Sequence, residues 1–444
     1  MVDLRAPVAV RRIVDRLATH GHEAWAVGGA VRDAVLDHDG GDWDLATDAR
    51  PENVRRIFRR TVPLGIEHGT IGVVGADGVL YEVTTFRRDV ETTGRHAVVA
   101  FADTIDEDLA RRDFTINAIA WNPRTGELRD PFGGAEDLRA RTLRTVGQPA
   151  DRFAEDYLRV LRALRFAGHY DLTVDEATWA ALREAVPHLH VLSAERVREE
   201  LWKVLGKTRN ASATLRHYAG SGVLEALYPE VAATTIIERN GGTAWDVTLA
   251  AVDAIPPHRV LLRVAALLHA VGYPAARTRD LRGGWRYVGH ETMGARKADD
   301  MMRRLKASNA DTERVTDLVA KQTALFPPDA PDAGVRRWLV DVGPDLVRDL
   351  FRLRIALHRA APVPRGEKDL VMRWRKAHAV LLAHPVLGVR GLAVNGHDLQ
   401  AAGIPAGPGL GRTLALLFQH VLEDPTLNTR EQLLELARTG GAET

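Results

Sequence analysis

Short apolar runs bounded by glycine and aspartate characterise the first part of the chain. They cover residues 24–28, 44–46, 71–74 and 79–85. Their β-branched and aromatic content predicts strands, and Asp77-Gly78 between the last two predicts the turn of a hairpin. A helix is expected from about Pro51, since proline is favoured in the first turn of a helix. The N-terminal part is therefore predicted to be an α+β domain with a small mixed sheet.

A helical pattern replaces this one from about Ala150 onward. Apolar residues between Phe153 and Tyr170 recur at helical spacing, so a helix is expected there. Segments rich in Ala, Leu and Arg with the same periodicity continue to the C-terminus, interrupted by proline-rich stretches. The remainder of the chain is therefore predicted to be all-helical.

Composition limits the number of cores and the kind of compartment. A chain of 444 residues with 45% hydrophobic content is too long for one core, so about two to four domains are expected. The absence of cysteine excludes disulfides and thiolate metal sites. The sequence has neither a signal peptide nor an apolar run of about 20 residues, so we expect a cytoplasmic protein that does not interact with membranes.

The overall charge identifies no partner. Lys plus Arg total 60 and Asp plus Glu total 59. The segment from Arg352 to Lys376 is nevertheless locally basic, with eight Lys or Arg against two acids and with Trp374 among them. This cluster suits a track for nucleic-acid phosphates, although a solvated helix face would have the same composition.

Two carboxylates follow a glycine turn near the N-terminus. Asp42 and Asp44 are expected to project to the same face of a strand, because side chains alternate along it. Their mutual repulsion would be relieved by divalent cations, and Glu82 on a neighbouring predicted strand has suitable parity to be a third ligand. Gly28 and Gly29 would let backbone N–H groups approach phosphates. Each feature alone is common: most Asp-x-Asp pairs are turns or surface acids.

Two further polar groups lie beyond the predicted sheet. Arg111, Arg112 and Asp113 come directly before a predicted helix that contains the polar residue Asn117. Asp156 and Arg159 are expected to share one helix face at i, i+3. Such a pair is normally a surface ion pair, but it also presents an acceptor and a donor fork to the edge of a base.

These motifs together resemble one known family. VGGAVRD, GDWDLAT, DLARRDFTINAIA, DPFGGAEDL and AEDYLRVLRALRFA occur in the order and spacing of bacterial class II tRNA nucleotidyltransferases, the CCA-adding enzymes, which are grouped with bacterial poly(A) polymerases. The resemblance implies a polymerase-β-like head at residues 1–145 and a nucleobase-reading neck at 146–206. It also implies a helical body at 207–330 and a tRNA-binding tail at 331–444.

The resemblance also implies a reaction and its residues. Family members add cytidine, cytidine and adenosine to the 3′ end of tRNA from CTP and ATP, and they hold the acceptor arm and TψC region. Asp42 and Asp44 would hold two Mg²⁺ ions, with Glu82 as a further catalytic acid. The residues implied for nucleotide binding are Gly28, Gly29, Arg32, Arg111, Arg112, Asp113, Asn117, Asp156, Arg159 and Arg162, with Glu155 supporting them.

Two regions qualify this picture. The loop between the sheet and Arg111 is full length, with Asp89 and Arg95 as candidate switching contacts, which favours CCA or terminal-A addition over CC-only addition. The body is similar to a metal-dependent HD phosphohydrolase domain, but Ala270 follows His269 where that family has Asp. His269 and His290 are therefore expected to be packing residues rather than metal ligands.

Three functions remain open on the sequence. The first is a CCA-adding enzyme. The second is a terminal-A-adding enzyme or a poly(A) polymerase of the same family. The third is a catalytically inactive RNA-binding scaffold, which the complete set of motif residues disfavours.

Overall fold

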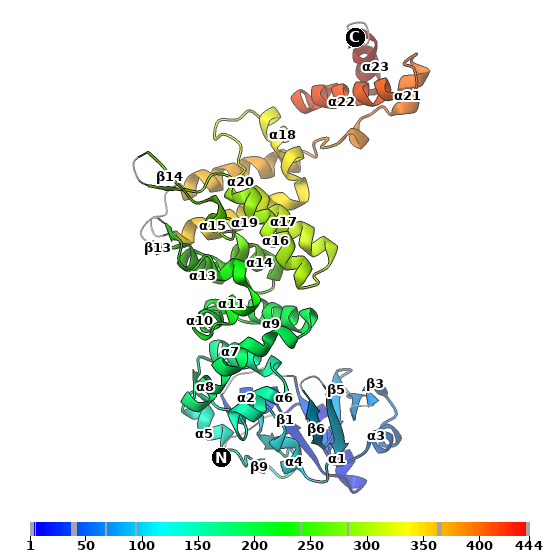
Figure 1. Ribbon diagram of the computed structural model, residues 1–444. Coiled ribbons are helices and arrows are strands. Elements are labelled where there is room, and N and C mark those ends of the chain that lie inside the picture. The colour runs from blue at the N-terminus through cyan, green and yellow to red at the C-terminus, as the bar shows by residue number, and fades with distance from the viewer. Residues whose placement is uncertain are drawn as a thin grey trace. The chain divides into compact units, whose positions relative to one another are not determined.

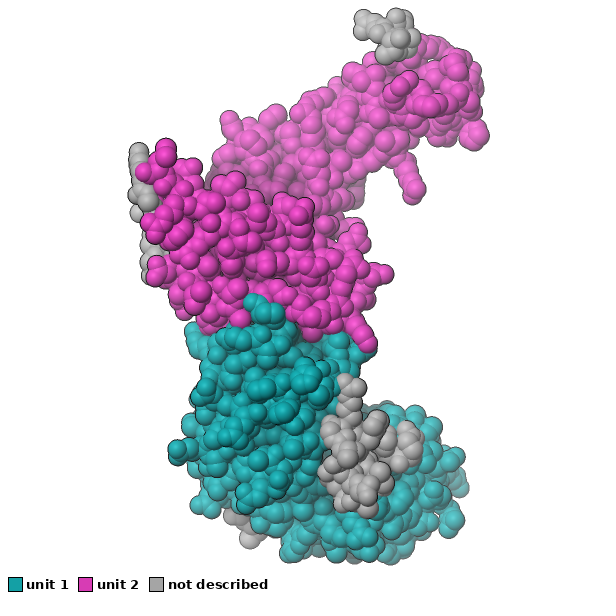
Figure 2. All heavy atoms as spheres, in the orientation of Figure 1, with its two compact units in different colours: residues 1–229 teal, residues 230–444 magenta. Residues whose placement is uncertain are grey.

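A computed structural model describes residues 4, 6–36, 42–66, 69–93, 96–239, 242–281, 284–361 and 366–440. It divides into two compact units, Met1–Pro229 and Glu230–Thr444 (Figure 2). Arg95 and the side chain of Asp89 lie outside the described part of the chain. None of the helices within the described ranges is long and apolar enough to span a bilayer.

A seven-stranded mixed sheet forms the centre of the first unit (Figure 1). Its order is β3 (Thr61–Gly65), β4 (Thr70–Val74), β5 (Leu80–Thr85), β2 (Asp44–Thr47), β1 (Ala24–Val27), β8 (Ala120–Trp121) and β9 (Leu128–Arg129). Within this sheet, as far as the structure describes it, β2 and β5 pair in parallel and the other neighbouring strands pair antiparallel. The predicted strands and the hairpin around Asp77-Gly78 are confirmed, because β4 and β5 pair antiparallel across that turn.

Helices and a separate hairpin complete this unit. The helices are α1 (Val8–Thr19), α2 (Gly29–Val35), α3 (Pro51–Ile57), α4 (Ile105–Ala110), α5 (Gly134–Arg139), α6 (Pro149–Glu155), α7 (Leu158–Tyr170), α8 (Glu176–Ala185), α9 (Ala194–Lys207), α10 (Ala211–Ser221) and α11 (Val223–Leu227). The hairpin joins β6 (Arg87–Thr93) and β7 (His96–Phe101), and β10 (Thr142–Leu143) pairs with β11 (Thr173–Val174). The helix expected from Pro51 is confirmed as α3.

Two local expectations are wrong. The helical segment from Phe153 to Tyr170 is two helices, because Asp156 has an extended backbone between α6 and α7. Asp156 and Arg159 therefore do not share one helix face. The helix predicted after Asp113 is a single 3₁₀ turn, Thr115–Asn117, after which the chain enters β8. In both places polar side chains that bind the backbone or distant residues override the helical periodicity.

The sheet and helix α7 bury the apolar residues that set the position of the site. Trp25, Val27 and Ala46 from the sheet pack with Ile105 and Leu109 of α4. Helix α7 buries Leu161 and Leu164 and so presents its opposite, arginine-bearing face to the space above the sheet.

Helices make up most of the second unit. They are α13 (Ala244–Ala254), α14 (Val260–Leu268), α15 (Tyr273–Ala276), α16 (His290–Arg304), α17 (Asn309–Lys321), α18 (Asp332–Val342), α19 (Pro344–Ala360), α20 (Glu367–Leu382), α21 (Gly396–Ala401), α22 (Pro408–Glu423) and α23 (Arg430–Gly440), and α12 (Pro229–Ala232) begins at the boundary. The strand pairs β12–β13 (Glu238–Arg239 with Gly242–Thr243) and β14–β15 (Thr278–Arg279 with Trp285–Arg286) are small departures from the all-helical expectation.

The expected packing role of the two body histidines is confirmed. His269 and His290 are 3% and 9% exposed. Their Nδ1 atoms lie 2.9 Å from the Ala266 carbonyl and 2.7 Å from the Tyr287 carbonyl. In the ranges that the structure describes, no group of three or more His, Asp or Glu side chains is arranged to hold a metal ion.

Candidate active site

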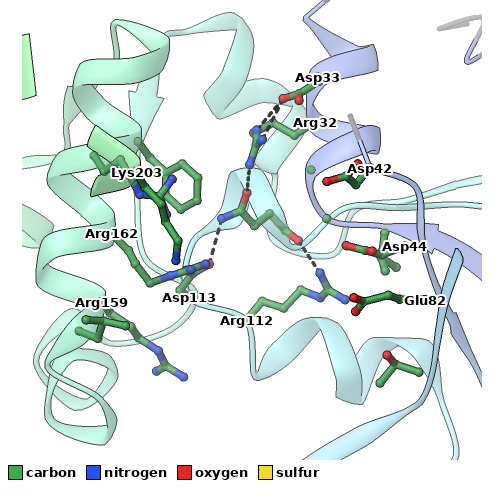
Figure 3. Close-up of a pocket in the computed structure, with 18 of the residues that line it drawn as sticks. Arg32, Asp33, Asp42, Asp44, Glu82, Arg112, Asp113, Arg159, Arg162 and Lys203 are labelled. Carbon is green, nitrogen blue, oxygen red and sulfur yellow. Dashed lines mark hydrogen bonds and ion pairs between the residues drawn. The ribbon is translucent and has the colours of Figure 1, made fainter. Parts of the chain in front are cut away.

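A cavity of about 990 Å³ lies between the end of the sheet and helices α7 and α9 (Figure 3). Eight arginines and two lysines line it against seven Asp or Glu residues. All the predicted site residues line this one cavity: Gly28, Gly29, Arg32, Asp42, Asp44, Glu82, Arg111, Arg112, Asp113, Asn117, Asp156, Arg159 and Arg162. Residues spread over 135 positions of sequence are thus brought to one place.

Three carboxylates form one wall of the cavity. Asp44 begins β2, and the parallel register Leu45↔Val83 places Glu82 of β5 beside it. Asp42 precedes the strand, so the predicted alternation of side chains along a strand does not apply to it. Its side chain nevertheless lies near that of Asp44 (Figure 3). Trp43 packs on Trp121 instead, with ring centroids 6.1 Å apart.

The electrostatics of this wall favour a cation. Burial, followed by the charge of Glu82, raises the pKa of Asp44 to about 6; Arg112 opposes this shift and Asp42 adds to it. A raised pKa means that the protein alone compensates the negative charge of this carboxylate poorly. Carboxylate oxygens are the ligands that Mg²⁺ prefers, so the donor set fits divalent cations. Among the described residues no group of three such side chains is arranged to hold a metal ion, and Asp42 and Asp44 are the pair on this wall that the sequence predicted.

The glycine turn lies directly against this wall. Gly28 has φ +74°, which favours glycine, and a Cβ there would lie 3.5 Å from Arg112 Nη1 and 3.8 Å from Asp44 Oδ2. At Gly29 a Cβ would lie 3.6 Å from Arg32 Nη2. The turn therefore keeps free the space between the carboxylates and the arginines.

Arg32 is buried at 7% exposure in a network of hydrogen bonds. Its Nη1 donates to Asn117 Oδ1 at 2.6 Å and its Nε donates to Asp33 Oδ1 at 3.0 Å. Nη2 donates to the Tyr170 hydroxyl. Asp33 and Tyr170 were not among the predicted site residues. The signal available for Tyr170 was its spacing from Arg162 and Phe166, which places all three on one face of α7.

The three residues of the motif Arg111–Asp113 make different contacts. Arg112 donates to Asp108 Oδ2 at 3.1 Å and to the Asn117 carbonyl at 3.3 Å, which holds it beside Asp44. Arg111 lines the cavity. Asp113 is 8% exposed and accepts from Arg162 Nε at 2.7 Å and from Asn117 Nδ2 at 3.0 Å. Asp113 therefore binds other protein side chains of the site.

Asp156 and Arg159 both line the cavity at the start of α7, and the Arg159 N–H donates to the Asp156 carbonyl at 3.0 Å. Asp156 Oδ1 accepts from the Leu158 N–H at 3.0 Å, and Oδ2 accepts from Arg196 Nη2 at 2.6 Å. Arg159 pairs with Glu155, the expected supporting residue. Arg196 comes from α9 and was missed, because no local pattern connects it with Asp156.

A buried glutamate supports the opposite wall. Glu200 of α9 is 1% exposed and binds Arg165 Nε at 2.7 Å and Lys203 Nζ at 2.8 Å. Burial alone would raise the pKa of Glu200, but Arg165 and Lys203 outweigh it and lower that pKa. These three residues were not predicted from the sequence, and their contacts keep two cationic side chains, Arg165 and Lys203, at the cavity (Figure 3 labels Lys203).

Comparison with known proteins agrees with this architecture. The family described as "Poly A polymerase head domain" matches residues 24–144. The family described as "Probable RNA and SrmB- binding site of polymerase A" matches residues 171–234. The first of these matched segments contains the sheet and the carboxylates.

Whole-length relatives extend the likeness to the entire chain. The CCA-adding enzyme of Geobacillus kaustophilus is 35% identical over 424 residues, covering 95% of this chain and 94% of the relative. That of Anoxybacillus flavithermus is 34% identical over 435 residues, covering 96% and 95%. The crystal structure of the Bacillus stearothermophilus CCA-adding enzyme in complex with CTP superposes with a TM-score of 0.74 at 29% identity, covering 98% of each chain. With this identity over nearly its full length, the chain belongs to the family of CCA-adding enzymes.

Proposed function

We propose that this protein adds cytidine, cytidine and adenosine to the 3′ end of tRNA, using CTP and ATP and releasing pyrophosphate. The observation that carries the proposal is the single cavity in which the carboxylates Asp42, Asp44 and Glu82 face the pair Asp156 and Arg159. A site of this kind can hold the phosphates of a nucleotide at one end and its base at the other. The full-length likeness to CCA-adding enzymes selects this reaction among nucleotidyl transfers.

Enzymes that transfer nucleotides generally use divalent metal ions. Asp42 and Asp44, with Glu82 beside them, would hold two Mg²⁺ ions, whose chemistry is to activate the 3′-hydroxyl of the RNA and to offset charge on the triphosphate. The raised pKa of Asp44 and the crowding of carboxylates support this assignment.

The phosphates of the nucleotide would lie along the glycine turn. Gly28 and Gly29 leave room there, and Arg32 and Arg112 are each held in place by neighbouring acceptors. Arg111 lines the same space. These guanidinium groups would bind the triphosphate through charge-assisted hydrogen bonds. Asp113, Asn117 and Arg162 would act by supporting them.

Asp156 and Arg159 would select the base. Cytosine and adenine both present an amino donor beside a ring-nitrogen acceptor, which suits a carboxylate next to a guanidinium. Uracil and guanine would direct an oxygen at the carboxylate and leave both groups without a hydrogen bond. Both side chains are held in place before a nucleotide binds. Leu158 and Arg196 hold Asp156, and Glu155 holds Arg159.

The second unit would hold the acceptor arm and TψC region of tRNA. Three of the basic residues predicted as a phosphate track bind carbonyls of the protein itself: Arg354 binds Gln322, Arg373 binds Phe326 and Lys376 binds Ala330. Lys368 and Arg375 of α20 are exposed and are the better candidates for phosphate contacts. The four-part division of the chain and a cytoplasmic location stay predictions.

A primer-extension assay separates the open alternatives. Transcripts of tRNA ending before CCA, after the first C, and after CC are incubated with CTP, ATP or both. We expect two cytidines with CTP alone and a complete CCA end with both nucleotides. Extension only of the CC-ending transcript would identify a terminal-A-adding enzyme, and long adenosine tails would identify a poly(A) polymerase. The absence of any incorporation by folded protein with Mg²⁺ would indicate a scaffold.

A further inference from the structure

Arg32 is held from several sides, and two of the residues that hold it, Asp33 and Tyr170, have had no role assigned to them. Asp33 Oδ1 accepts from its Nε and lies 2.9 Å from its Nη2, and the Tyr170 hydroxyl also accepts from Nη2. Asn117 accepts from Nη1. A guanidinium has five N–H groups, and these contacts among the described residues use four. The fifth, on Nη1, remains available in the cavity.

Tyr170 makes two kinds of contact with this arginine. Its hydroxyl accepts from Arg32 and donates to Asp33 Oδ1 at 2.9 Å, so it closes a triangle of hydrogen bonds. Its ring lies against the guanidinium, whose central carbon is 4.4 Å from the ring centroid. Burial raises the pKa of Tyr170 to about 12, so the hydroxyl keeps its proton and donates at neutral pH. Arg32 is therefore fixed both in position and in the plane of its guanidinium.

The same contacts connect the head to helix α7 at two points. Arg162, near the middle of α7, binds Asp113, which binds Asn117, which binds Arg32. Tyr170, the last residue of α7, binds Arg32 from the other side. The helix that follows Asp156 and carries Arg159 is thus tied twice to the arginine beside the glycine turn.

We propose that Tyr170, together with Asp33, is a positioning residue that orients Arg32 toward the triphosphate of the incoming nucleotide. The inference rests on the proposed function, in which Arg32 binds that triphosphate. Because Tyr170 acts on the phosphate end, it sets the affinity for CTP and ATP alike and leaves the choice of base to Asp156 and Arg159. A tyrosine with a purely structural role would not separate these two properties.

The test is Tyr170→Phe, which removes the hydroxyl and keeps the ring. Losing a hydrogen bond to a charged group predicts a KM for CTP and for ATP that is raised by the same factor, roughly tenfold. Affinity for cytidine, which has no phosphates, should be unchanged, as should the ratio of CTP to UTP incorporation. The matched control is Tyr81→Phe, since the Tyr81 hydroxyl also donates to an aspartate, Asp77, at 2.7 Å, but lies outside the cavity.

A double-mutant cycle shows whether Tyr170 acts through Arg32. In an Arg32→Ala background, Tyr170→Phe should have no further effect on KM. Additive effects, or an equal loss of affinity for cytidine and CTP, would overturn the positioning role. The positioning role would also be overturned if the KM of Tyr170→Phe were unchanged while the wild type extended tRNA normally. If the wild type itself incorporates neither nucleotide, it is the proposed function that fails.

Discussion

Replacing Asp113 by asparagine removes one buried charge while keeping the shape of the side chain. Asp113 accepts hydrogen bonds from the Phe114 N–H at 2.9 Å, Asn117 Nδ2 at 3.0 Å and Arg162 Nε at 2.7 Å, and Arg162 Nη2 lies 2.7 Å from the same oxygen. In Asp113→Asn the amide would direct N–H groups at either Arg162 or Asn117. The variant therefore loses the charge that compensates Arg162. It also places the N–H donors of the amide opposite the N–H donors of Arg162 or Asn117.

The magnitude follows from burial. Breaking a fully buried ion pair from one side costs about 3–5 kcal/mol, because the remaining charge stays uncompensated. The Arg162 side chain is 33% exposed, so water compensates part of this loss. We therefore expect the free energy of unfolding of the first unit to fall by about 2–3 kcal/mol. For a unit of this size that lowers its unfolding midpoint by roughly 4–12 °C.

The loss of stability in Asp113→Asn should depend on pH, and the direction of this dependence follows from the pKa of Asp113. Burial alone would raise the pKa of Asp113, but Arg162 and Asn117 outweigh it and hold that pKa below its usual value. A carboxyl with a depressed folded pKa contributes stability that is fully present above the unfolded pKa of about 3.9 and is lost as the pH falls through the folded value. The free energy of unfolding of the wild type should therefore exceed that of the variant by a constant amount between pH 8 and about pH 5. Below about pH 4 the difference should become smaller.

Calorimetric unfolding of both full-length proteins measures the difference. The matched control is Asp106→Asn, because Asp106 also binds an arginine, Arg129, through two hydrogen bonds but at the surface. Exposed ion pairs contribute little, so its unfolding midpoint should barely change. If Asp113→Asn were as stable as Asp106→Asn and lost only nucleotide affinity, the interpretation of Asp113 as the support of Arg162 would be refuted.

Further predictions concern the metal, the base and the RNA. Asp42→Ala should abolish nucleotide incorporation while leaving calorimetric unfolding unchanged, and normal turnover would contradict its metal role. Asp156→Ala should bind Mg²⁺ normally but lose about 10- to 100-fold of the discrimination against UTP and GTP, measured by competition; unchanged selectivity would reject the base-reading assignment. Replacing Lys368 and Arg375 by alanine should weaken tRNA binding at low salt and reduce the slope of log K against log salt by about 1–2, which titrations at several salt concentrations measure. An unaltered slope would place the phosphate contacts elsewhere.

The part of the site that contains the carboxylates and the glycine turn was largely predictable from local pattern. Short β-branched and aromatic runs identified the strands, and Asp44 and Glu82 lie on two of these strands, which the structure pairs in parallel. Gly28 was recognisable because a turn between strand and helix favours a residue that tolerates positive φ. These features depend on neighbours within a few residues, which a single sequence displays directly.

The supporting contacts could not be predicted in this way. Tyr170 and Asp33 are 137 positions apart in the chain, and Arg196 reaches Asp156 across 40. The break at Asp156 also escaped the pattern, because the apolar spacing continues through it while its carboxylate binds the Leu158 N–H. A buried charge is stable only beside partners that compensate it, and those partners come from whichever elements pack there.

The sequence by itself therefore determined the mixed sheet, the helical remainder and the acids and arginines available for chemistry. Only the tertiary structure decided that they converge on one cavity and which of them hold the others in place. The reason is physical: secondary structure follows from local periodicity, whereas the orientation of a guanidinium or a carboxylate is set by the hydrogen bonds it finds after distant segments have packed together.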